Sequence, residues 1–182
     1  MIRSDILRDI APILRDQLVV CNIGLPSQEL HLIDDQPSNF YMLGTMGLSS
    51  SIGLGVALAQ DKTVISIDGD GSVLTNFGTL PTIANNVANN YILLIIDNGS
   101  YGSTGDQPTY AGQKTSLTNV ATSPPGPSTR ASPPSPGGWS PRSAPSSSLI
   151  PKLFAMNLRC SRPVSSPTSP PAWATSSRPS PS

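Results

Sequence analysis

The stretch Thr63-Val-Ile-Ser-Ile-Asp-Gly-Asp-Gly-Ser72 places an apolar run directly before Asp70, an aspartate flanked by glycines. A second apolar run, Tyr91-Ile-Leu-Leu-Ile-Ile96, leads in the same way to Asp97 and Asn98. Short apolar runs bounded by turn residues are typical of strands buried in a parallel sheet. Because parallel strands end at the same edge of a sheet, we expect Asp70 and Asn98 to lie close together.

Segments of helical and extended character alternate around these two runs. Apolar residues recur at helical spacing near the N-terminus, and small apolar residues before Gln60 predict a helix packed closely against a sheet. The predicted helices are 2–18, 26–32, 47–60 and 73–89, and the predicted strands are 18–23, 39–43, 63–68 and 91–96. We expect Pro81 to kink or divide the last helix, and a glycine-rich loop over 101–113. The alternation predicts an α/β fold with a doubly wound parallel sheet.

The composition of the chain changes abruptly after residue 122. Residues 1–122 hold all eleven acidic residues, whereas residues 123–182 hold no acid and fifteen of the twenty prolines. Such a segment cannot bury enough apolar surface to offset the entropy lost on ordering. We therefore expect a folded domain over 1–121 and a disordered Pro/Ser/Arg-rich tail over 122–182.

The change of composition falls inside an unfinished α/β pattern, so the domain looks C-terminally truncated. We interpret the tail as translation of coding DNA in a shifted frame. A proline-rich ligand for a partner protein, or a basic arm for an anionic surface, is the alternative.

The rest of the composition favours a soluble cytoplasmic protein. The formal net charge is zero, and no stretch resembles a signal peptide or a membrane span. Cys21 and Cys160 have no metal-like spacing, and Cys21 is expected to be a small core residue. We expect no nucleic-acid or membrane partner.

The residues at the two strand ends suit a hard cation and a diphosphate. Asp70 offers an anionic oxygen, Asn98 a neutral one and the 98–100 turn a backbone carbonyl, which are ligands that Mg²⁺ accepts. Gly69 and Gly71 would let the backbone approach a diphosphate, and amides at the following helix start would point at it. The alternative is a plain strand–helix turn in which Asp70 caps the helix.

Gly69-Asp70-Gly71 followed by Asp97-Asn98 resembles the signature of thiamine-diphosphate-dependent enzymes, in which Gly-Asp-Gly precedes an Asn-Asn pair. The resemblance implies a sheet of the thiamine-diphosphate-binding type. It also implies that Asp70, the Asn98 side chain and the Ser100 carbonyl hold Mg²⁺ on the cofactor diphosphate, with Gly69, Gly71 and Ser72 beside it. Asp97 replaces the first asparagine of the family pair.

The segment Gly44-Thr-Met-Gly47 resembles the pyrimidine-side loop of the same family. By that resemblance the Gly44 carbonyl would accept a bond from the cofactor 4′-amino group, and Met46 would support the bent cofactor. Ordinary core packing is the alternative for Met46. The serines at 49–51 would cap the helix or touch phosphate, and capping is favoured.

The family needs a glutamate on the pyrimidine nitrogen of the cofactor, and a separate pyrimidine-binding domain supplies it. The only glutamate here is Glu29, which precedes the cofactor segments and is expected to be surface-exposed. The resemblance therefore implies no activating acid in this chain. We expect half of an active site, completed by a pyrimidine-binding α subunit in a hetero-oligomer.

The loop Asp97-Asn-Gly-Ser-Tyr-Gly-Ser-Thr-Gly-Asp-Gln-Pro-Thr109 resembles the small-subunit branch that contains sulfopyruvate and phosphonopyruvate decarboxylases. This implies decarboxylation of a small 2-oxo acid, with 3-sulfopyruvate favoured. Ser103, Thr104 and Gln107 would then donate hydrogen bonds to a sulfonate or phosphonate, or else satisfy a lid loop.

Three alternatives stay open. The substrate could be phosphonopyruvate or another 2-oxo acid, and this product could be an inactive fragment. A dinucleotide-binding oxidoreductase domain is disfavoured, because the segment starting at Gly69 lacks the glycine that G-x-G-x-x-G requires at its sixth position.

Overall fold

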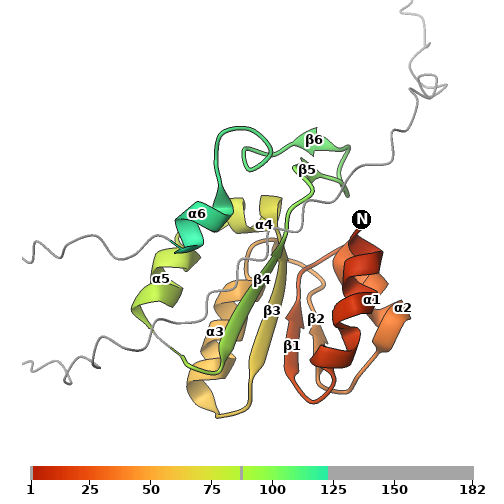
Figure 1. The fold of residues 1–182 in the computed structure, drawn as a ribbon, viewed down its shortest axis with the longest axis vertical. Helices are drawn as coiled ribbons and strands as arrows, with labels where there is room; N and C mark the ends of the chain where they lie inside the picture. The colour runs from red at the N-terminus through yellow and green to blue at the C-terminus, as the bar shows by residue number, and fades with distance from the viewer. Residues whose placement is uncertain (1, 87, 123–182) are drawn as a thin grey trace, which may run out of the picture.

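Four parallel strands form the main sheet in a computed structural model that describes residues 2–86 and 88–122 (Figure 1). Their order across the sheet is β2-β1-β3-β4. The helices are α1 (Arg3–Leu14), α2 (Leu25–Asp34), α3 (Ser49–Ala59), α4 (Asp70–Thr75), α5 (Thr79–Asn85) and α6 (Leu117–Thr122). The strands are β1 (Leu18–Cys21), β2 (Asn39–Tyr41), β3 (Val64–Gly69), β4 (Tyr91–Ile96), β5 (Ser100–Tyr101) and β6 (Gln107–Pro108).

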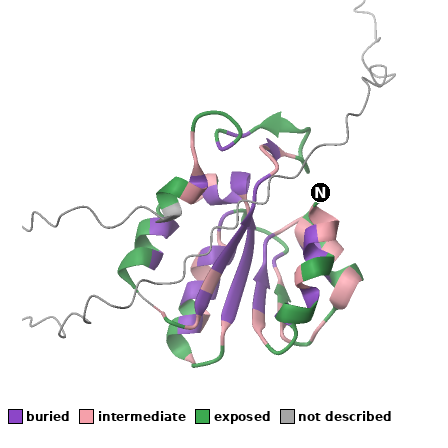
Figure 2. Ribbon diagram, in the orientation of Figure 1, coloured by how far each residue is buried: buried purple, intermediate pink, exposed green. Residues whose placement is uncertain are grey.

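Helices cover both faces of the sheet, which confirms the doubly wound parallel architecture expected from the sequence (Figure 1). Alternate residues of β4 point to opposite sides, so Leu93 packs in the core under α3 and α5, whereas Leu94 packs in the core under α1 and α2. Figure 2 shows the central strands buried along most of their length. This two-sided burial explains why the strands are continuous apolar runs in the sequence.

The close packing expected of the small-residue helix is also present. Gly53 of α3 lies against Ser66 of β3, and a Cβ atom added to Gly53 would overlap the Ser66 hydroxyl. The Ser66 hydroxyl donates to the Ser49 carbonyl at 3.0 Å, so strand and helix are also tied by a hydrogen bond. Cys21 is fully buried, as predicted.

Several predicted boundaries differ from the structure, and the largest differences concern three segments. The helix predicted at 73–89 is divided into α4 and α5, and α4 already begins at Asp70. The break precedes Pro81, which lies in the first turn of α5, where its missing N–H costs no helical hydrogen bond. The loop predicted over 101–113 contains one strand of the antiparallel β5–β6 pair and part of the other. The first helix ends at Leu14 rather than at residue 18.

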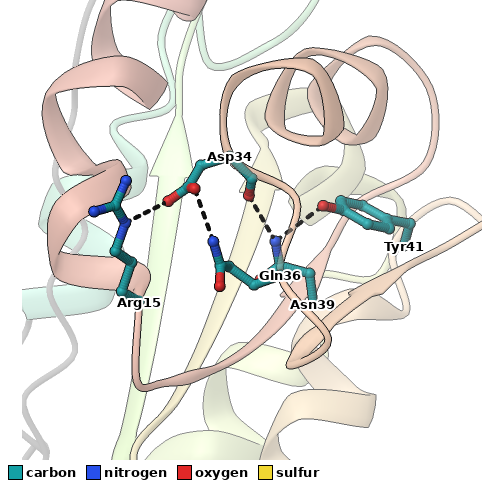
Figure 3. A network of polar contacts seen from close by, with 5 residues as sticks. All are labelled: Arg15, Asp34, Gln36, Asn39 and Tyr41. Atoms are coloured by element: carbon teal, nitrogen blue, oxygen red, sulfur yellow. Dashed lines mark hydrogen bonds and ion pairs between the residues drawn. The ribbon is translucent and has the colours of Figure 1, made fainter.

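A polar network joins the residue after α1, the end of α2 and strand β2 (Figure 3). Asp34, the last residue of α2, accepts hydrogen bonds from Arg15 Nε at 3.1 Å and from Gln36 Nε2 at 2.8 Å. Asn39 Nδ2 donates to the Asp34 carbonyl at 3.1 Å and to the Tyr41 hydroxyl at 2.9 Å. The hydrogen bonds from Arg15 and Gln36 lower the pKa of Asp34.

The predicted tail lies outside the residues that the structure describes, apart from the end of α6. The predictions of a truncated domain and of a shifted reading frame concern the same residues. Within the described ranges, no helix is both long enough and apolar enough to span a membrane.

Candidate functional site

A cavity of about 760 Å³ opens at the carboxyl ends of β1, β3 and β4. Its wall includes Asn22 and Gly24 after β1, the 69–72 turn after β3, and Asn98 after β4. The chain runs from β1 to β2 on one side and continues through β3 and β4 on the other. The cavity therefore lies at the point where the strand order reverses, which is where doubly wound sheets bind ligands.

Most of the residues selected from the sequence meet in this cavity. The selected residues among its lining are Met46, Gly69, Asp70, Gly71, Ser72, Asn98, Ser100, Ser103 and Thr104. Gly44 and Gln107 are exposed and are not part of the lining. Gln107 Nε2 instead donates to the Thr104 carbonyl at 3.0 Å and so closes the β5–β6 hairpin. The roles predicted for Gly44 and Gln107 stay predictions.

Asp70 and Asn98 are brought together by the register of β3 and β4, in which Gly69 is opposite Ile96. The Asp70 side chain is 1% exposed, and backbone amides of Gly71 and Asn98 hydrogen-bond its carboxylate. Burial raises the pKa of Asp70, the charge of Asp97 raises it further, and the hydrogen bond from the Thr109 hydroxyl opposes the rise. A divalent cation here would stabilise the ionised carboxylate that burial disfavours.

The turn after β4 is held by short-range hydrogen bonds. Asn98 Oδ1 accepts from the Ser100 amide at 3.3 Å, and Asn98 Nδ2 donates to the Ser100 hydroxyl, also at 3.3 Å. Asp97 Oδ1 accepts from the Gly99 amide at 2.9 Å, and Gly99 adopts a φ of 68°. Gly99 thus supplies the left-handed conformation that turns the chain back toward Asp70.

The oxygen atoms at this edge fit Mg²⁺. Among the described residues, no group of three or more His, Cys, Asp or Glu side chains could hold a metal. A cation would instead depend on the Asp70 carboxylate, the Asn98 amide oxygen and the Ser100 carbonyl. Mg²⁺ commonly combines one or two carboxylates with neutral, water and phosphate oxygens, so this donor set is suitable.

Met46 lies on the cavity wall and is 44% exposed, so the alternative that it packs in the core is wrong. The serines that follow it do not cap α3 with their side chains, which is also a correction. The Ser49 hydroxyl donates to Asp68 Oδ2 at 2.6 Å instead. Burial raises the pKa of Asp68 to about 6, although hydrogen bonds from Ser49 and Ser72 oppose this rise.

Glu29 is not surface-exposed as predicted. Arg3 Nε and Nη2 donate to the two Glu29 carboxylate oxygens, each at 2.7 Å, and the Glu29 side chain is only 27% exposed. Both residues line the cavity, because the start of α1 packs beside the start of α2. Glu29 therefore lies in the cavity wall with its charge paired to a guanidinium.

Three residues of the site were not selected from the sequence. The Thr109 hydroxyl bonds to Asp70, and Asn22 Oδ1 accepts from the Ser72 hydroxyl at 3.1 Å. The Tyr101 ring lies against Gly71, where a Cβ atom would overlap it. Gly71 thus makes room for an aromatic ring as well as for any ligand. Thr109 ends the quoted loop motif and Asn22 ends a strand, but no local pattern indicates their partners.

A parallel doubly wound sheet with a cavity at the reversal of its strand order defines a class of α/β domains that bind ligands at the carboxyl ends of their strands. A family model described as "Thiamine pyrophosphate enzyme, C-terminal TPP binding domain" matches residues 26–131, and the chain belongs to this family. This membership excludes the dinucleotide-binding alternative.

The chain is similar to proteins named "Sulfopyruvate decarboxylase subunit beta". It is 54% identical over 109 residues to the one from Methanococcus maripaludis, covering 60% of this chain and 59% of that protein. It is 52% identical over 120 residues to the one from Methanocaldococcus jannaschii, covering 65% of this chain and 64% of that protein. The chain therefore spans less than two thirds of these curated relatives.

More distant similarities extend to a second decarboxylase and to a solved structure. A "Phosphonopyruvate decarboxylase" of Streptomyces viridochromogenes is 44% identical over 102 residues, or 56% of this chain and 26% of that protein. A putative thiamin diphosphate-dependent enzyme from Mycobacterium smegmatis superposes with a TM-score of 0.55 at 20% identity, over 66% of this chain and 25% of that one. The superposition supports the fold alone.

Proposed function

We propose that this chain is the cofactor-binding subunit of a thiamine-diphosphate- and Mg²⁺-dependent 2-oxo acid decarboxylase. The observation that carries the proposal is the meeting of Asp70 and Asn98 in the cavity at the strand-order reversal. Because the chain is 54% and 52% identical to two proteins named as sulfopyruvate decarboxylase β subunits, 3-sulfopyruvate is the favoured substrate. Its products would be sulfoacetaldehyde and CO₂, in coenzyme M biosynthesis in the cytoplasm.

In this proposal the domain over 1–121 binds the diphosphate end of the cofactor. Asp70, the Asn98 amide oxygen and the Ser100 carbonyl hold Mg²⁺, and Gly69, Gly71 and the Ser72 amide lie beside the diphosphate. When bound, thiamine diphosphate accepts the electron pair left behind as CO₂ departs. The residues of this chain anchor the metal and the diphosphate and orient the reactive end of the cofactor.

Met46 and Gly44 belong to the pyrimidine side of the site. Met46 already projects its half-exposed side chain at the cavity, which supports its role beneath the bent cofactor. Gly44 is exposed two residues earlier, so its carbonyl is free to face a ligand or a partner surface. The exposure of both residues leaves them accessible to a second polypeptide.

The activating acid must come from a partner. Glu29 is the only glutamate of the chain, and its two carboxylate oxygens are held by Arg3. A carboxylate held through both oxygens by Arg3 would have to leave this ion pair before it could reach a cofactor nitrogen. We infer that a pyrimidine-binding α subunit supplies the glutamate and that the hetero-oligomer is the active species.

The substrate would bind under the loop that follows β5. Ser103 lies against Gly24, close enough that a Cβ on Gly24 would stand 3.3 Å from the Ser103 hydroxyl. Ser103 therefore reaches from the β4 side of the cavity toward the β1 side, and Thr104 lies beside it in the cavity lining. Their hydroxyls suit a sulfonate, but a phosphonate offers similar oxygens, so phosphonopyruvate is the second candidate.

Co-expression with a pyrimidine-domain subunit tests the proposal. The purified complex should decarboxylate sulfopyruvate faster than phosphonopyruvate or pyruvate when thiamine diphosphate and Mg²⁺ are supplied, and the isolated chain should not. Decarboxylation by the isolated chain would contradict the half-site. A complex that binds neither cofactor nor metal would instead support the alternative of an inactive fragment.

A further inference from the structure

Gly47 is hydrogen-bonded through both its amide and its carbonyl to one short helix. Its N–H donates to the Ser72 hydroxyl at 2.8 Å, and its carbonyl accepts from Asn76 Nδ2 at 2.8 Å. Ser72 belongs to α4, and Asn76 is the residue that ends it. We call Gly47, Ser72 and Asn76 the Gly47 clamp.

The clamp leaves no space for any other residue at this position. A Cβ on Gly47 would stand 2.6 Å from Thr75 Oγ1, 2.9 Å from Asn76 Cβ and 3.0 Å from the Ser72 carbonyl oxygen. Gly47 also has a φ of 91°, in the region that side chains rarely adopt. The backbone of Gly47 therefore packs directly against α4, with no side chain between them.

The residues before Gly47 are held in a strained conformation. Thr45 has a φ of 61°, although it is not a glycine. Strained backbone of this kind persists only where the surrounding structure fixes it, and it gathers at sites that orient a ligand. Met46 lies between these two residues, on the cavity wall. The clamp thus holds the residue directly after Met46 on both of its backbone polar groups.

The same helix also carries the metal-side residue. Asp70 is the first residue of α4, and the Ser72 hydroxyl that accepts from Gly47 donates onward to Asn22 Oδ1 at 3.1 Å. The Met46 loop, the Asp70 turn and the end of β1 are thereby joined through Ser72. Asn76 is bound to the loop but is not part of the cavity lining.

We propose that Asn76 and the Ser72 hydroxyl are positioning residues that fix the separation between Met46 and Asp70. Since, under the proposed function, Asp70 anchors the diphosphate and Met46 supports the other end of the cofactor, this separation determines whether both ends fit together. Asn76 acts without touching the cofactor. Its loss should weaken binding of the whole cofactor but not binding of a diphosphate alone.

The test compares the binding of two ligands, thiamine diphosphate and inorganic pyrophosphate. Each ligand is titrated in the presence of Mg²⁺ into the complex of this chain with the pyrimidine-domain subunit. Asn76→Asp keeps the shape of the side chain but removes the amide donor that bonds to the Gly47 carbonyl and to the Ser51 hydroxyl. We expect the affinity of this variant for thiamine diphosphate to fall about tenfold, as for the loss of part-buried hydrogen bonds, with its pyrophosphate affinity changed less than about twofold. Asn85→Asp is the matched control, because Asn85 is exposed and donates to the Pro81 carbonyl on α5.

A double-mutant cycle with Met46→Ala separates positioning from a general structural role. If Asn76 acts through Met46, Asn76→Asp should add little to the loss caused by Met46→Ala. Should Asn76→Asp fail to fold, Asn76→Ser gives the same comparison, because serine removes the carboxamide donor without introducing a charge. Faster hydrogen exchange at the Gly47 amide would show that the clamp has opened.

The inference is overturned if pyrophosphate affinity falls as much as cofactor affinity, if neither changes, or if the two substitutions are additive. Failure of the proposed function looks different. In that case the wild-type complex itself binds neither ligand with Mg²⁺, and the clamp is overturned together with it.

Discussion

The hydroxyl of Thr109 donates a hydrogen bond to Asp70 Oδ2, although the two residues are separated by 39 positions in the chain. Thr109 is 1% exposed, and its amide donates to the Gly99 carbonyl at 2.9 Å. One residue after β6 therefore holds both the carboxylate at the end of β3 and the turn at the end of β4. The chain beyond β4 is thus part of the proposed metal site and is more than a cover over it.

Thr109→Val should raise the Mg²⁺ concentration needed to bind thiamine diphosphate. Valine keeps the shape of the side chain but leaves Asp70 without the hydroxyl that orients it, and loss of such a supporting bond typically weakens metal binding roughly 10–100-fold. The measurement is a Mg²⁺ titration of the complex at fixed cofactor. Thr82→Val is the control, because Thr82 is exposed on α5 and its hydroxyl donates to the Gly78 carbonyl. An unchanged Mg²⁺ midpoint in Thr109→Val would show that Thr109 does not support metal binding.

Two glycines of α3 should respond oppositely to alanine. Gly53→Ala should destabilise the fold by about 1–3 kcal/mol, because the added Cβ would overlap the Ser66 hydroxyl. Gly55→Ala should stabilise it by about 0.5–1 kcal/mol, since no atom lies within 4 Å of the new Cβ and alanine favours helix. Urea unfolding of the full chain measures both changes. Equal effects would mean that α3 does not pack on β3 as described.

The polar network around Asp34 predicts a pH-dependent contribution to stability. The pKa of Asp34 is lowered by its hydrogen bonds from Arg15 and Gln36, so the ionised side chain favours the folded state. This contribution is present above the ordinary pKa of aspartate and is lost as the pH falls through the lowered value. Arg15→Gln should therefore destabilise the chain at neutral pH and have a smaller effect in acid. A difference in unfolding midpoint that is constant with pH would contradict this role.

Glu29→Gln should not stop activation of the cofactor. Its carboxylate is held by Arg3, so the substitution should lower stability while proton exchange at the reactive carbon of the bound cofactor continues in the complex. Rapid-quench measurement of that exchange is the direct assay. Exchange reduced to the rate of free cofactor would mean that Glu29 is the activating acid and that the half-site argument is wrong.

The core of the site could be predicted because it depends on local patterns. Two apolar runs, each ending in a polar turn, predicted β3 and β4, and the parallel register then placed Asp70 beside Asn98. The cavity at the same edge followed from the general behaviour of doubly wound sheets. Met46 was placed by its short motif, and the structure shows it at the cavity.

The polar contacts that support the site could not be predicted in this way. Asn76 and Gly47 are 29 positions apart, and Thr109 and Asp70 are 39 positions apart. Hydrogen bonds of this kind depend on tertiary placement, and hydrophobic periodicity carries no information about them. Glu29 was misplaced for the same reason, because only the packing of α1 on α2 brings Arg3 to it.

The most direct test of the central claim is Mg²⁺-dependent binding of thiamine diphosphate to the assembled complex, measured for the wild-type chain and for Asp70→Ala. The account predicts binding by the wild-type complex that is lost when Mg²⁺ is chelated, and no Mg²⁺-dependent binding by Asp70→Ala. Binding that is unchanged by the substitution would contradict the assignment of Asp70 and Asn98 as the metal and diphosphate site.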